Sequence, residues 1–407
     1  MWETAVGLAD IDAGSEASPD TQYRVGSITK TFTSAAIMQL RDAGKLDLED
    51  TLDRHVEGVA HRPTLRRLLS HSSGLQRETH DDSWLTLRFA AADELVATLD
   101  RAEQVLPAGA RFHYSNLAYA LLGVVVERAS GIPYERYVRE RLLEPLGLAR
   151  TTFAPQPPAA KGYLVRPYSD GAWDTVAVET GAWAAAGQLW GTVGDLCRWA
   201  AFLGEPDGPV LARASVEEMR TIQVIDDHER WTAGYGLGLG LRRDGERILA
   251  GHSGSMPGFI ARFYVSPSER IGVAALTNES EASLDELALG LVRATADAWP
   301  VAPEAWRPAA EPPPDDVLPL LGIWFVEASR LVVGWRDGRL EGRYDGIPDW
   351  KPSSVFEREA PDRWRTVSGP EQGEVLRVER GADGAVRRLV WAGYPVTREP
   401  GPWRASG

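Results

Sequence analysis

The chain has only one cysteine, Cys197, among its 407 residues. A disulfide bond within the chain is therefore excluded. Leu196, Trp199 and Leu203 recur around Cys197 at helical spacing,. We interpret Cys197 as a residue of a packed helix and not as a nucleophile.

Basic clusters and long apolar runs are also missing. The chain has 44 Lys and Arg against 58 Asp and Glu, a formal net charge of −14. Without a basic cluster, a nucleic-acid partner is not expected. No apolar stretch reaches the roughly 18 residues of a membrane span. The start shows no basic segment followed by an apolar run, so we predict no signal peptide and a cytoplasmic location.

The patterns that bind metals and nucleotides are absent too. The 7 histidines are scattered without metal-ligand spacing,. No glycine-rich phosphate loop occurs, and the lack of Gly-x-Ser-x-Gly argues against an α/β-hydrolase. We therefore predict neither a metal nor a cofactor, and a small molecule as the partner. The oligomeric state does not follow from the sequence.

Lysine is rare, and one lysine stands in a special position. The chain has 4 lysines against 40 arginines, and Lys30 lies three residues after Ser27. Chance predicts only about 0.2 Ser-x-x-Lys occurrences for this composition. A serine hydroxyl becomes a useful nucleophile beside a group that takes its proton. Lysine can lose its proton when it is buried, whereas arginine cannot.

Residues 27–43 are apolar on nearly every face and are followed by Gly44, which predicts a buried helix that ends there,. Ser27 would lie at its N-terminus, where the helix dipole favours a developing anion. Lys30 would follow one turn later on the same face. The alternative is that Ser27 is a plain N-cap and Lys30 is solvated.

Two further motifs follow. Tyr114-Ser115-Asn116 precedes a helical stretch at 117–129, and His252-Ser253-Gly254-Ser255 ends an apolar strand-like segment. Their order resembles that of the penicillin-recognising serine hydrolases: class C β-lactamases, D-alanyl-D-alanine peptidases, D-aminopeptidases and related esterases. The phrases at 23–33, 68–75 and 187–192 agree with this resemblance, which covers residues 1 to about 300.

The resemblance implies roles for the first two motifs. Ser27 matches the nucleophile that forms an acyl-enzyme, and Tyr114 matches a general base that Lys30 assists. A tyrosine ordinarily titrates near 10, so a nearby cation has to help it. The alternative for Tyr114 is an aromatic side chain packed before a helix.

The resemblance also implies a substrate-binding set. Asn116 matches a side-chain amide that binds the substrate's amide, and Ser253, Gly254 and Ser255 match a strand beside the substrate. The backbone N–H groups of Ser27 and Ser255 would form the oxyanion hole. An N-cap for the helix at 117–129 is the alternative for Asn116.

His252 departs from most β-lactamases of this type, which carry lysine at its position. We include His252 in the predicted catalytic set. Because histidine is only partly charged near neutral pH, we expect weak or absent β-lactam hydrolysis and favour peptide, amide, ester or thioester substrates. The alternative is a structural histidine at a strand end. We interpret His71, which lies in another family-like phrase, as structural.

These observations favour a serine acyl-hydrolase acting on a peptide-like (D-amino acid) or ester substrate through an acyl-enzyme. An acyl-transferase or thioesterase that cyclises or releases peptides is one alternative. A β-lactamase and a non-catalytic penicillin-binding sensor or scaffold are two others. Loops at 79–105, 153–178 and 222–234 are expected to set the choice of substrate.

The predicted fold class of residues 1–299 is α/β (α+β), with the site in a crevice between a sheet half and a helical half. We expect a strand at 2–10, mostly helices at 30–225, an antiparallel meander at 235–277 and a helix at 284–298. Relatives usually carry a helix before the segment that matches 2–10. We therefore expect a truncated N-terminus and a partly uncovered apolar surface beside the helix at 284–298.

A change of composition divides the chain. Prolines predict a stiff linker at 300–315, followed by a small antiparallel barrel at 316–407 that resembles a lipocalin-like domain. Eight short β-like runs are expected, at 322–326, 330–335, 339–344, 354–359, 363–367, 374–379, 386–391 and 394–398. Six of the 15 tryptophans fall here, which indicates an aromatic core. The alternative is that a barrel loop reaches over the Ser27 crevice.

Overall fold

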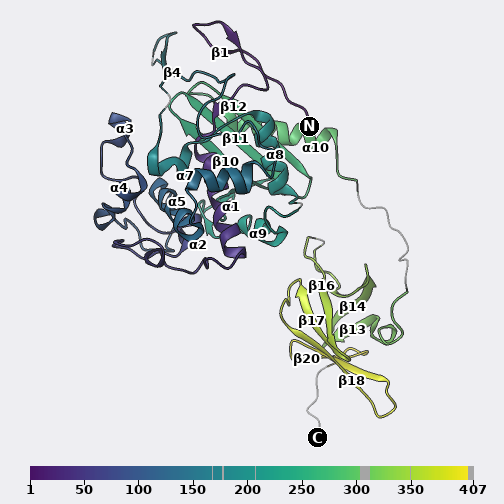
Figure 1. The fold of residues 1–407 in the computed structure, drawn as a ribbon. Helices are drawn as coiled ribbons and strands as arrows, with labels where there is room; N and C mark the ends of the chain where they lie inside the picture. Colours follow the sequence, from purple (N-terminus) through teal and green to yellow (C-terminus); the bar gives the residue numbers. More distant parts are fainter. Residues whose placement is uncertain (167, 177, 207, 303–311, 349, 402–407) are drawn as a thin grey trace. The chain divides into compact units, whose positions relative to one another are not determined.

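The computed structural model describes residues 1–166, 168–176, 178–206, 208–302, 312–348 and 350–401. The chain divides into two compact units, Met1–Ala302 and Pro303–Gly407 (Figure 1). Most of the predicted linker, residues 303–311, lies outside the described residues.

A six-stranded antiparallel sheet forms the centre of the first unit, in the order β12-β11-β10-β9-β8-β7. Its strands are β7 (Val224–Ile225), β8 (Ala233–Tyr235), β9 (Gly240–Asp244), β10 (Arg247–Met256), β11 (Phe259–Ser266) and β12 (Ile271–Thr277). Two-residue turns join β9 to β10 and β10 to β11. The predicted meander is thus confirmed.

Helices cover both faces of this sheet (Figure 1). The α-helices are α1 (Thr29–Asp42), α2 (Leu65–Leu69), α3 (Ser83–Thr86), α4 (Ala92–Val96), α5 (Asn116–Ser130), α6 (Tyr134–Val138), α7 (Ala184–Gly187), α8 (Val193–Gly204), α9 (Arg213–Met219) and α10 (Leu284–Ala298). Short 3₁₀ turns are η1 (Gly26–Ile28), η2 (Leu52–Arg54), η3 (Leu99–Arg101) and η5 (Gly181–Trp183), and η4 (Arg139–Leu143) is a π-helical turn. Two-residue periodicity in β11 sends Phe263 toward the α1 and α8 core and Tyr264 toward α10,.

The helix that carries the Ser-x-x-Lys motif is buried on nearly all sides, as predicted. It begins as η1 and continues as α1, and Gly44 follows its end with a φ of 66°. That left-handed backbone costs glycine no Cβ clash. Phe32 of α1 stacks on Trp199 of α8 with ring centroids 4.0 Å apart. This packing fixes the helix in the centre of the unit.

The strand predicted at 2–10 is mostly wrong. Only β1 (Leu8–Asp10) forms, and it pairs with β2 (Ser15–Glu16) in a separate hairpin. Trp2 and Val6 are 75% and 89% exposed, so no partner strand or core covers them. Two other small sheets pair β3 (Tyr23–Arg24) with β6 (Trp190–Gly191) and β4 (Tyr163–Val165) with β5 (Ala172–Asp174).

The helix predicted at 284–298 forms as α10. Its residues Leu284, Ala288 and Val292 are buried against the sheet, whereas Leu287 is 52% exposed. The expected uncovered apolar surface is therefore limited, on this helix, to a part of the stripe.

The second unit is an eight-stranded antiparallel barrel, and the predicted runs agree closely with its strands. These are β13 (Gly322–Val326), β14 (Ser329–Arg336), β15 (Arg339–Tyr344), β16 (Ser354–Ala360), β17 (Arg363–Ser368), β18 (Val375–Arg380), β19 (Val386–Trp391) and β20 (Tyr394–Val396). The 3₁₀ turn η6 (Leu318–Leu320) precedes them. Backbone hydrogen bonds between Phe325 and Thr397, of 2.7 and 2.9 Å, join the first strand to the last.

Aromatic side chains fill the barrel. Trp324, Trp364 and Trp391 are buried with Phe356, whereas Trp350 is 77% exposed. Trp324 donates its indole N–H to the Leu320 carbonyl at 2.7 Å. The predicted aromatic core is therefore present, although not every tryptophan belongs to it.

Among the helices that the structure describes, none is long and apolar enough to cross a bilayer.

Candidate active site

Ser27 and Lys30 meet at the start of the central helix. Ser27 lies in η1 and Lys30 in the first turn of α1, and Lys30 Nζ is 3.0 Å from Ser27 Oγ. Lys30 Nζ also donates to the Ala186 carbonyl at 2.7 Å. Lys30 is fully buried, and the alternative of a solvated first-turn lysine is therefore wrong.

The surroundings of Lys30 disfavour its charged form. Burial holds the pKa of Lys30 well below its usual range, the nearby Glu78 carboxylate raises it, and the Arg77 guanidinium lowers it. No acidic side chain forms an ion pair with Lys30 among the described residues. A neutral amine beside a serine hydroxyl can accept a proton from it.

Tyr114 lies over Lys30 at the entrance to α5. Lys30 Nζ is 5.0 Å from the centroid of the Tyr114 ring, and the Arg77 guanidinium carbon is also 5.0 Å from it. Burial raises the pKa of Tyr114, while a hydrogen bond with Ser27 and the charge of Arg77 lower it. Ser115, and not Asn116, caps α5, because its Oγ accepts from the Ala118 N–H at 3.0 Å.

Strand β10 borders the site with a partly free edge. Its pairing with β9 stops at Gly251, whereas its pairing with β11 continues to Met256. Hydrogen-bonded pairs alternate along an antiparallel ladder, starting here from the two-residue turn after Met256. The backbone groups of Ser253 and Ser255 consequently point away from β11, toward the free edge.

Two glycines let this edge approach Ser27. A Cβ on Gly26, whose φ is 51°, would lie 2.7 Å from Ser255 N, and a Cβ on Gly254 would lie 1.8 Å from Val25 O. Neither space can hold a side chain without backbone movement. Gly254 therefore keeps β10 against the segment that carries Ser27.

His252 lies behind the site and is fully hydrogen-bonded. Its Nδ1 contacts the Ser253 carbonyl, which can only accept, so Nδ1 carries the proton,. Its Nε2 therefore accepts from the Tyr235 hydroxyl at 2.8 Å. Burial is the main cause that lowers the pKa of His252 to about 3. Desolvation therefore favours a neutral ring, whereas the sequence led us to expect a partly charged histidine.

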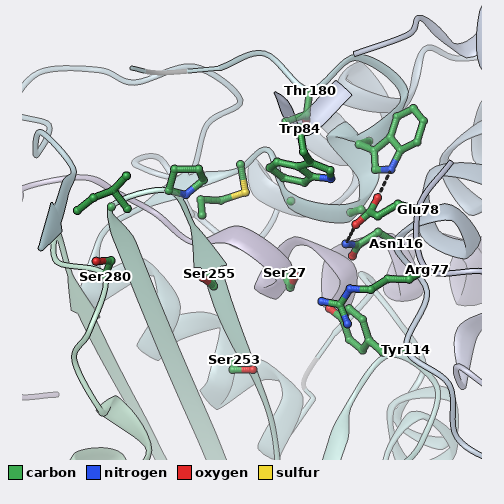
Figure 2. A pocket seen from close by; sticks show the side chains of 17 residues that line it. Ser27, Arg77, Glu78, Trp84, Tyr114, Asn116, Thr180, Ser253, Ser255 and Ser280 are labelled. Carbon is green, nitrogen blue, oxygen red and sulfur yellow. Dashed lines mark hydrogen bonds between the residues drawn. The ribbon is translucent and has the colours of Figure 1, made fainter. Parts of the chain in front are cut away.

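The predicted residues come together around one cavity of about 630 Å³ (Figure 2). Ser27, Tyr114, Asn116, Ser253 and Ser255 line it. Its other lining residues are Arg77, Glu78, Trp84, Leu164, Thr180, Trp183, Ala186, Gly187, Met256, Pro257, Gly258 and Ser280. They come from the helical half and from the sheet, as the predicted crevice requires. Lys30, Gly254 and His252 are not part of the described lining, but Lys30 and His252 are hydrogen-bonded to Ser27 and Ser253, which are.

Sequence reasoning missed Arg77 and Glu78. Both line the cavity, and Glu78 accepts hydrogen bonds from Asn116 Nδ2 and from Trp183 Nε1, the latter at 3.0 Å (Figure 2). The predicted substrate loop at 79–105 begins two residues too late to include both of them. Trp84 from that loop and Leu164 from the loop at 153–178 reach the cavity, but no residue of the loop at 222–234 is part of its described lining.

His71 is buried and does not belong to the described lining of the cavity. Its Nδ1 accepts from the Ser115 N–H at 3.1 Å, and its ring lies 4.1 Å from that of Tyr114. This position agrees with a structural role. In the described part of the chain, no group of three His, Cys, Asp or Glu side chains is arranged to hold a metal ion.

A family model described as Beta-lactamase matches residues 1–297. The chain belongs to the Beta-lactamase family. A second model, described as Domain of unknown function (DUF7586), matches residues 313–398, which include all eight strands of the barrel. The family match therefore covers the first unit. The description of the second model names no activity for the barrel.

Two curated relatives of this Beta-lactamase family member show how its length compares with theirs. Penicillin-binding protein 4 of Amycolatopsis lactamdurans is 30% identical over 359 residues, covering 81% of this chain and 91% of the relative. Beta-lactamase-like protein 2 of Dictyostelium discoideum is 30% identical over 247 residues, covering 56% of this chain. The chain spans only 44% of that second relative.

Solved structures of similar fold include a D-stereospecific amidohydrolase and a D-amino acid amidase. A D-stereospecific amidohydrolase from Streptomyces sp. matches with 29% identity and a TM-score of 0.57, over 64% of this chain and 83% of its own. A D-amino acid amidase from Ochrobactrum anthropi matches with 25% identity and a TM-score of 0.59, over 72% and 86%. An octameric penicillin-binding protein homologue from Pyrococcus abyssi matches with 25% identity and a TM-score of 0.65, over 96% and 91%.

Proposed function

We propose that this member of the Beta-lactamase family is a serine acyl-hydrolase that acts on a peptide-like amide of a D-amino acid, or on an ester. The observation that carries the proposal is the 3.0 Å contact between Lys30 Nζ and Ser27 Oγ at the floor of an open cavity. Lys30 is fully buried there, and its pKa is held well below the usual range by burial. A nucleophile and a neutral base in contact are the minimum that acyl transfer requires.

Lys30 and Tyr114 both contact the Ser27 hydroxyl, and the effect of burial on their pKa values favours Lys30 as the first proton acceptor. Lys30 touches the serine oxygen and is driven toward its neutral form, whereas burial raises the pKa of Tyr114 and keeps its phenol protonated. In this scheme Ser27 Oγ bonds to the substrate carbonyl carbon while its proton moves to Lys30. The proton then passes to the leaving amine or alcohol, directly or through the Tyr114 hydroxyl. Tyr114 acts as a relay and not as the general base.

The developing oxyanion would lie between the backbone N–H groups of Ser27 and Ser255. Their proximity is supported by Gly26, whose Cβ would lie 2.7 Å from Ser255 N. Ser255 N–H points toward the free edge of β10, so no strand competes for it. Fixed backbone donors at such a position stabilise tetrahedral intermediates strongly. A water molecule would then repeat the sequence on the acyl-enzyme.

The neutral state of His252 bears on substrate choice. A lysine in its place would offer a cation to a substrate carboxylate, whereas the two nitrogens of His252 are bound to Ser253 and Tyr235. We therefore expect weak β-lactam hydrolysis at most. The similarity to a D-stereospecific amidohydrolase and to a D-amino acid amidase supports D-residue amides as the first substrates to test. Transfer of the acyl group to an amine is the second candidate, because acylation uses the same residues.

The test is hydrolysis of p-nitrophenyl acetate, p-nitrophenyl butyrate, a D-alanyl anilide and nitrocefin, in stopped-flow and steady-state experiments. Ser27→Ala is the matched control. Turnover of the ester or anilide that disappears in Ser27→Ala is the expected result. A stoichiometric burst without turnover would favour a sensor or a transferase that awaits its acceptor. The absence of any Ser27-dependent signal would refute the proposal.

A further inference from the structure

Glu78 places a carboxylate in the cavity wall without a cationic partner. Its hydrogen-bond donors are the neutral side chains of Asn116 and Trp183. It forms no ion pair with any described Lys, Arg or His. Arg77 is its neighbour in sequence, but the Arg77 guanidinium lies 5.0 Å over the ring of Tyr114. The charge of Glu78 is therefore available to something that enters the cavity.

Glu78 also determines the orientation of the Asn116 amide. A carboxylate only accepts hydrogen bonds, so the Asn116 NH₂ group has to face it. Asn116 Oδ1 is left facing the other way, buried and without a partner in the described part of the chain. We expected the side-chain amide of Asn116 to bind the substrate's amide, for which it would both donate and accept hydrogen bonds. In the structure only its acceptor is free.

The resulting subsite presents two acceptors from neighbouring side chains. Asn116 Oδ1 and the Glu78 carboxylate offer oxygen lone pairs, while the Arg77 guanidinium, which lines the same cavity, lies over the ring of Tyr114 (Figure 2). A substrate carbonyl or carboxylate placed against Asn116 Oδ1 and Glu78 would be repelled by these two acceptors. A group with several N–H donors and a positive charge fits it, because hydrogen bonds that involve an ion are the stronger ones.

We propose that Asn116 Oδ1 and Glu78 bind the α-ammonium group of a substrate with an unsubstituted N-terminus, such as an amino acid amide or the first residue of a peptide. The inference rests on the proposed acyl-hydrolase function and narrows its substrate class. The subsite adjoins Ser27 in one cavity, so the carbonyl carbon next to the bound amine would face the serine. Trp84, Leu164 and Trp183 add apolar surface for a large side chain.

The test compares three anilides with the same side chain and leaving group. They are D-phenylalanine p-nitroanilide, its N-acetyl derivative and the 3-phenylpropionyl anilide, which lacks the amine. We expect wild-type kcat/KM to be about 10- to 100-fold higher for the free amine than for either analogue, the size of a hydrogen bond to an ion. This preference should decrease above about pH 8, where an α-amino group loses its proton.

Glu78→Gln tests the carboxylate, since glutamine has almost the same shape and can still accept from Asn116. The ratio of kcat/KM between the free amine and its N-acetyl derivative should fall about 10-fold or more. Glu179→Gln removes the same charge from an exposed residue next to Thr180 of the cavity wall, and should keep the wild-type ratio. Melting temperatures of both variants report whether the fold is intact.

The outcomes separate this inference from the proposed function. Ser27-dependent turnover with equal or greater preference for the N-acetyl anilide overturns the ammonium site and leaves the hydrolase intact. A free-amine preference that survives Glu78→Gln assigns the amine to another group and also overturns the site. If neither these anilides nor the esters show Ser27-dependent turnover, the hydrolase itself is refuted, and the ammonium site with it.

Discussion

The two units of the chain have different cores. In the first unit, Lys30, Arg24, His71 and His252 are buried together with many hydroxyl side chains. In the described part of the barrel, the only buried polar side chains are Ser354 and Thr366, and no ionisable side chain is buried. Tryptophan N–H groups there bind neighbouring oxygens, and the remainder of the core is apolar.

The comparison separates core residues that stabilise the fold from core residues whose burial lowers its stability. Burying a titratable group disfavours its charged form and lowers the free energy of unfolding wherever that charge would be present in water. The barrel avoids this cost. The first unit carries it close to Ser27, where lowered pKa values are chemically useful. Variants of each core should therefore affect different properties of the protein.

The largest effect is expected from Lys30→Met, which keeps the length of the side chain and removes the amine. We expect kcat/KM for p-nitrophenyl butyrate to fall about 10²- to 10⁴-fold, as for loss of a positioned base. The free energy of unfolding at pH 7 should not decrease, because an apolar side chain replaces a buried amine. Steady-state kinetics and urea unfolding of the same samples measure both quantities.

The pH dependence of this variant gives a second reading. Unfolded Lys30 binds a proton below about pH 10.4, whereas the folded pKa is held well below that by burial. The unfolded state therefore binds more protons in this window, and wild-type stability rises with pH toward about 10.4. Lys30→Met should lack this rise. Identical pH dependence in both proteins would show that Lys30 is not neutral in the fold.

Trp324→Ala examines the other core. Trp324 is fully buried in the barrel and donates to the Leu320 carbonyl, so its removal should cost about 3–5 kcal/mol of unfolding free energy,. Calorimetry of the full chain measures the shift of the affected transition. Trp350→Ala is the control, because Trp350 is 77% exposed and its loss should change stability by less than about 0.5 kcal/mol,. Equal effects of the two substitutions would contradict the described barrel core.

His252→Gln tests the cost of a buried histidine at acidic pH. The folded pKa of about 3 lies below the unfolded value of about 6.5,. Below pH 6.5 the unfolded state binds the extra proton, so wild-type stability falls as the pH falls toward 3, by at most about 1.4 kcal/mol per pH unit from this group. Glutamine can still accept from Tyr235 but does not titrate.

Urea unfolding at pH 6.5, 5.5 and 4.5 gives the slope of unfolding free energy against pH for the wild type and for His252→Gln. We expect a flatter slope for His252→Gln. Burial also lowers the pKa of His71, but His71 is present in both proteins and contributes equally to both slopes. Parallel slopes would mean that His252 does not remain neutral in the folded protein. The barrel offers no equivalent, since no ionisable side chain is buried in its described part.

Much of this architecture could be predicted because its signals are local. The helix at 27–43 follows from apolar residues and Gly44, and the barrel strands follow from eight short β-like runs. The strand at 2–10 failed because a strand also needs a partner. Its apolar residues offered a pattern but no evidence of what would pair with it, and Trp2 and Val6 are exposed.

Arg77 and Glu78 could not be predicted from local signals. They follow the phrase at 68–75, and only long-range contacts bring them to the site. The N–H groups of Asn116 and Leu117 donate to the Arg77 carbonyl at 2.9 and 3.1 Å, which ties this loop to the start of α5. The lowered pKa of His252 likewise depends on its burial, which a motif does not report.

The smallest effects on kcat/KM are expected from removing the charges of Arg77 and Glu78, which sequence reasoning missed. The two substitutions should shift the pH profile in opposite directions. The Arg77 guanidinium lowers the pKa of Lys30 and the Glu78 carboxylate raises it. Arg77→Met should therefore move the rising limb of the kcat/KM profile to higher pH, and Glu78→Gln should move it to lower pH. Arg77 is exposed, so we expect only a two- to fivefold loss of kcat/KM at pH 6, about the size of an exposed charge interaction. An N-acetylated ester is the substrate, since it has no amine for Glu78 to bind.

Arg77→Lys retains the charge and should restore the wild-type profile, which a purely steric role of Arg77 over Tyr114 would not allow. Shifts in the same direction for Arg77→Met and Glu78→Gln would mean that the limb does not report on Lys30, and the buried lysine of the first core would then have to be assigned a structural role.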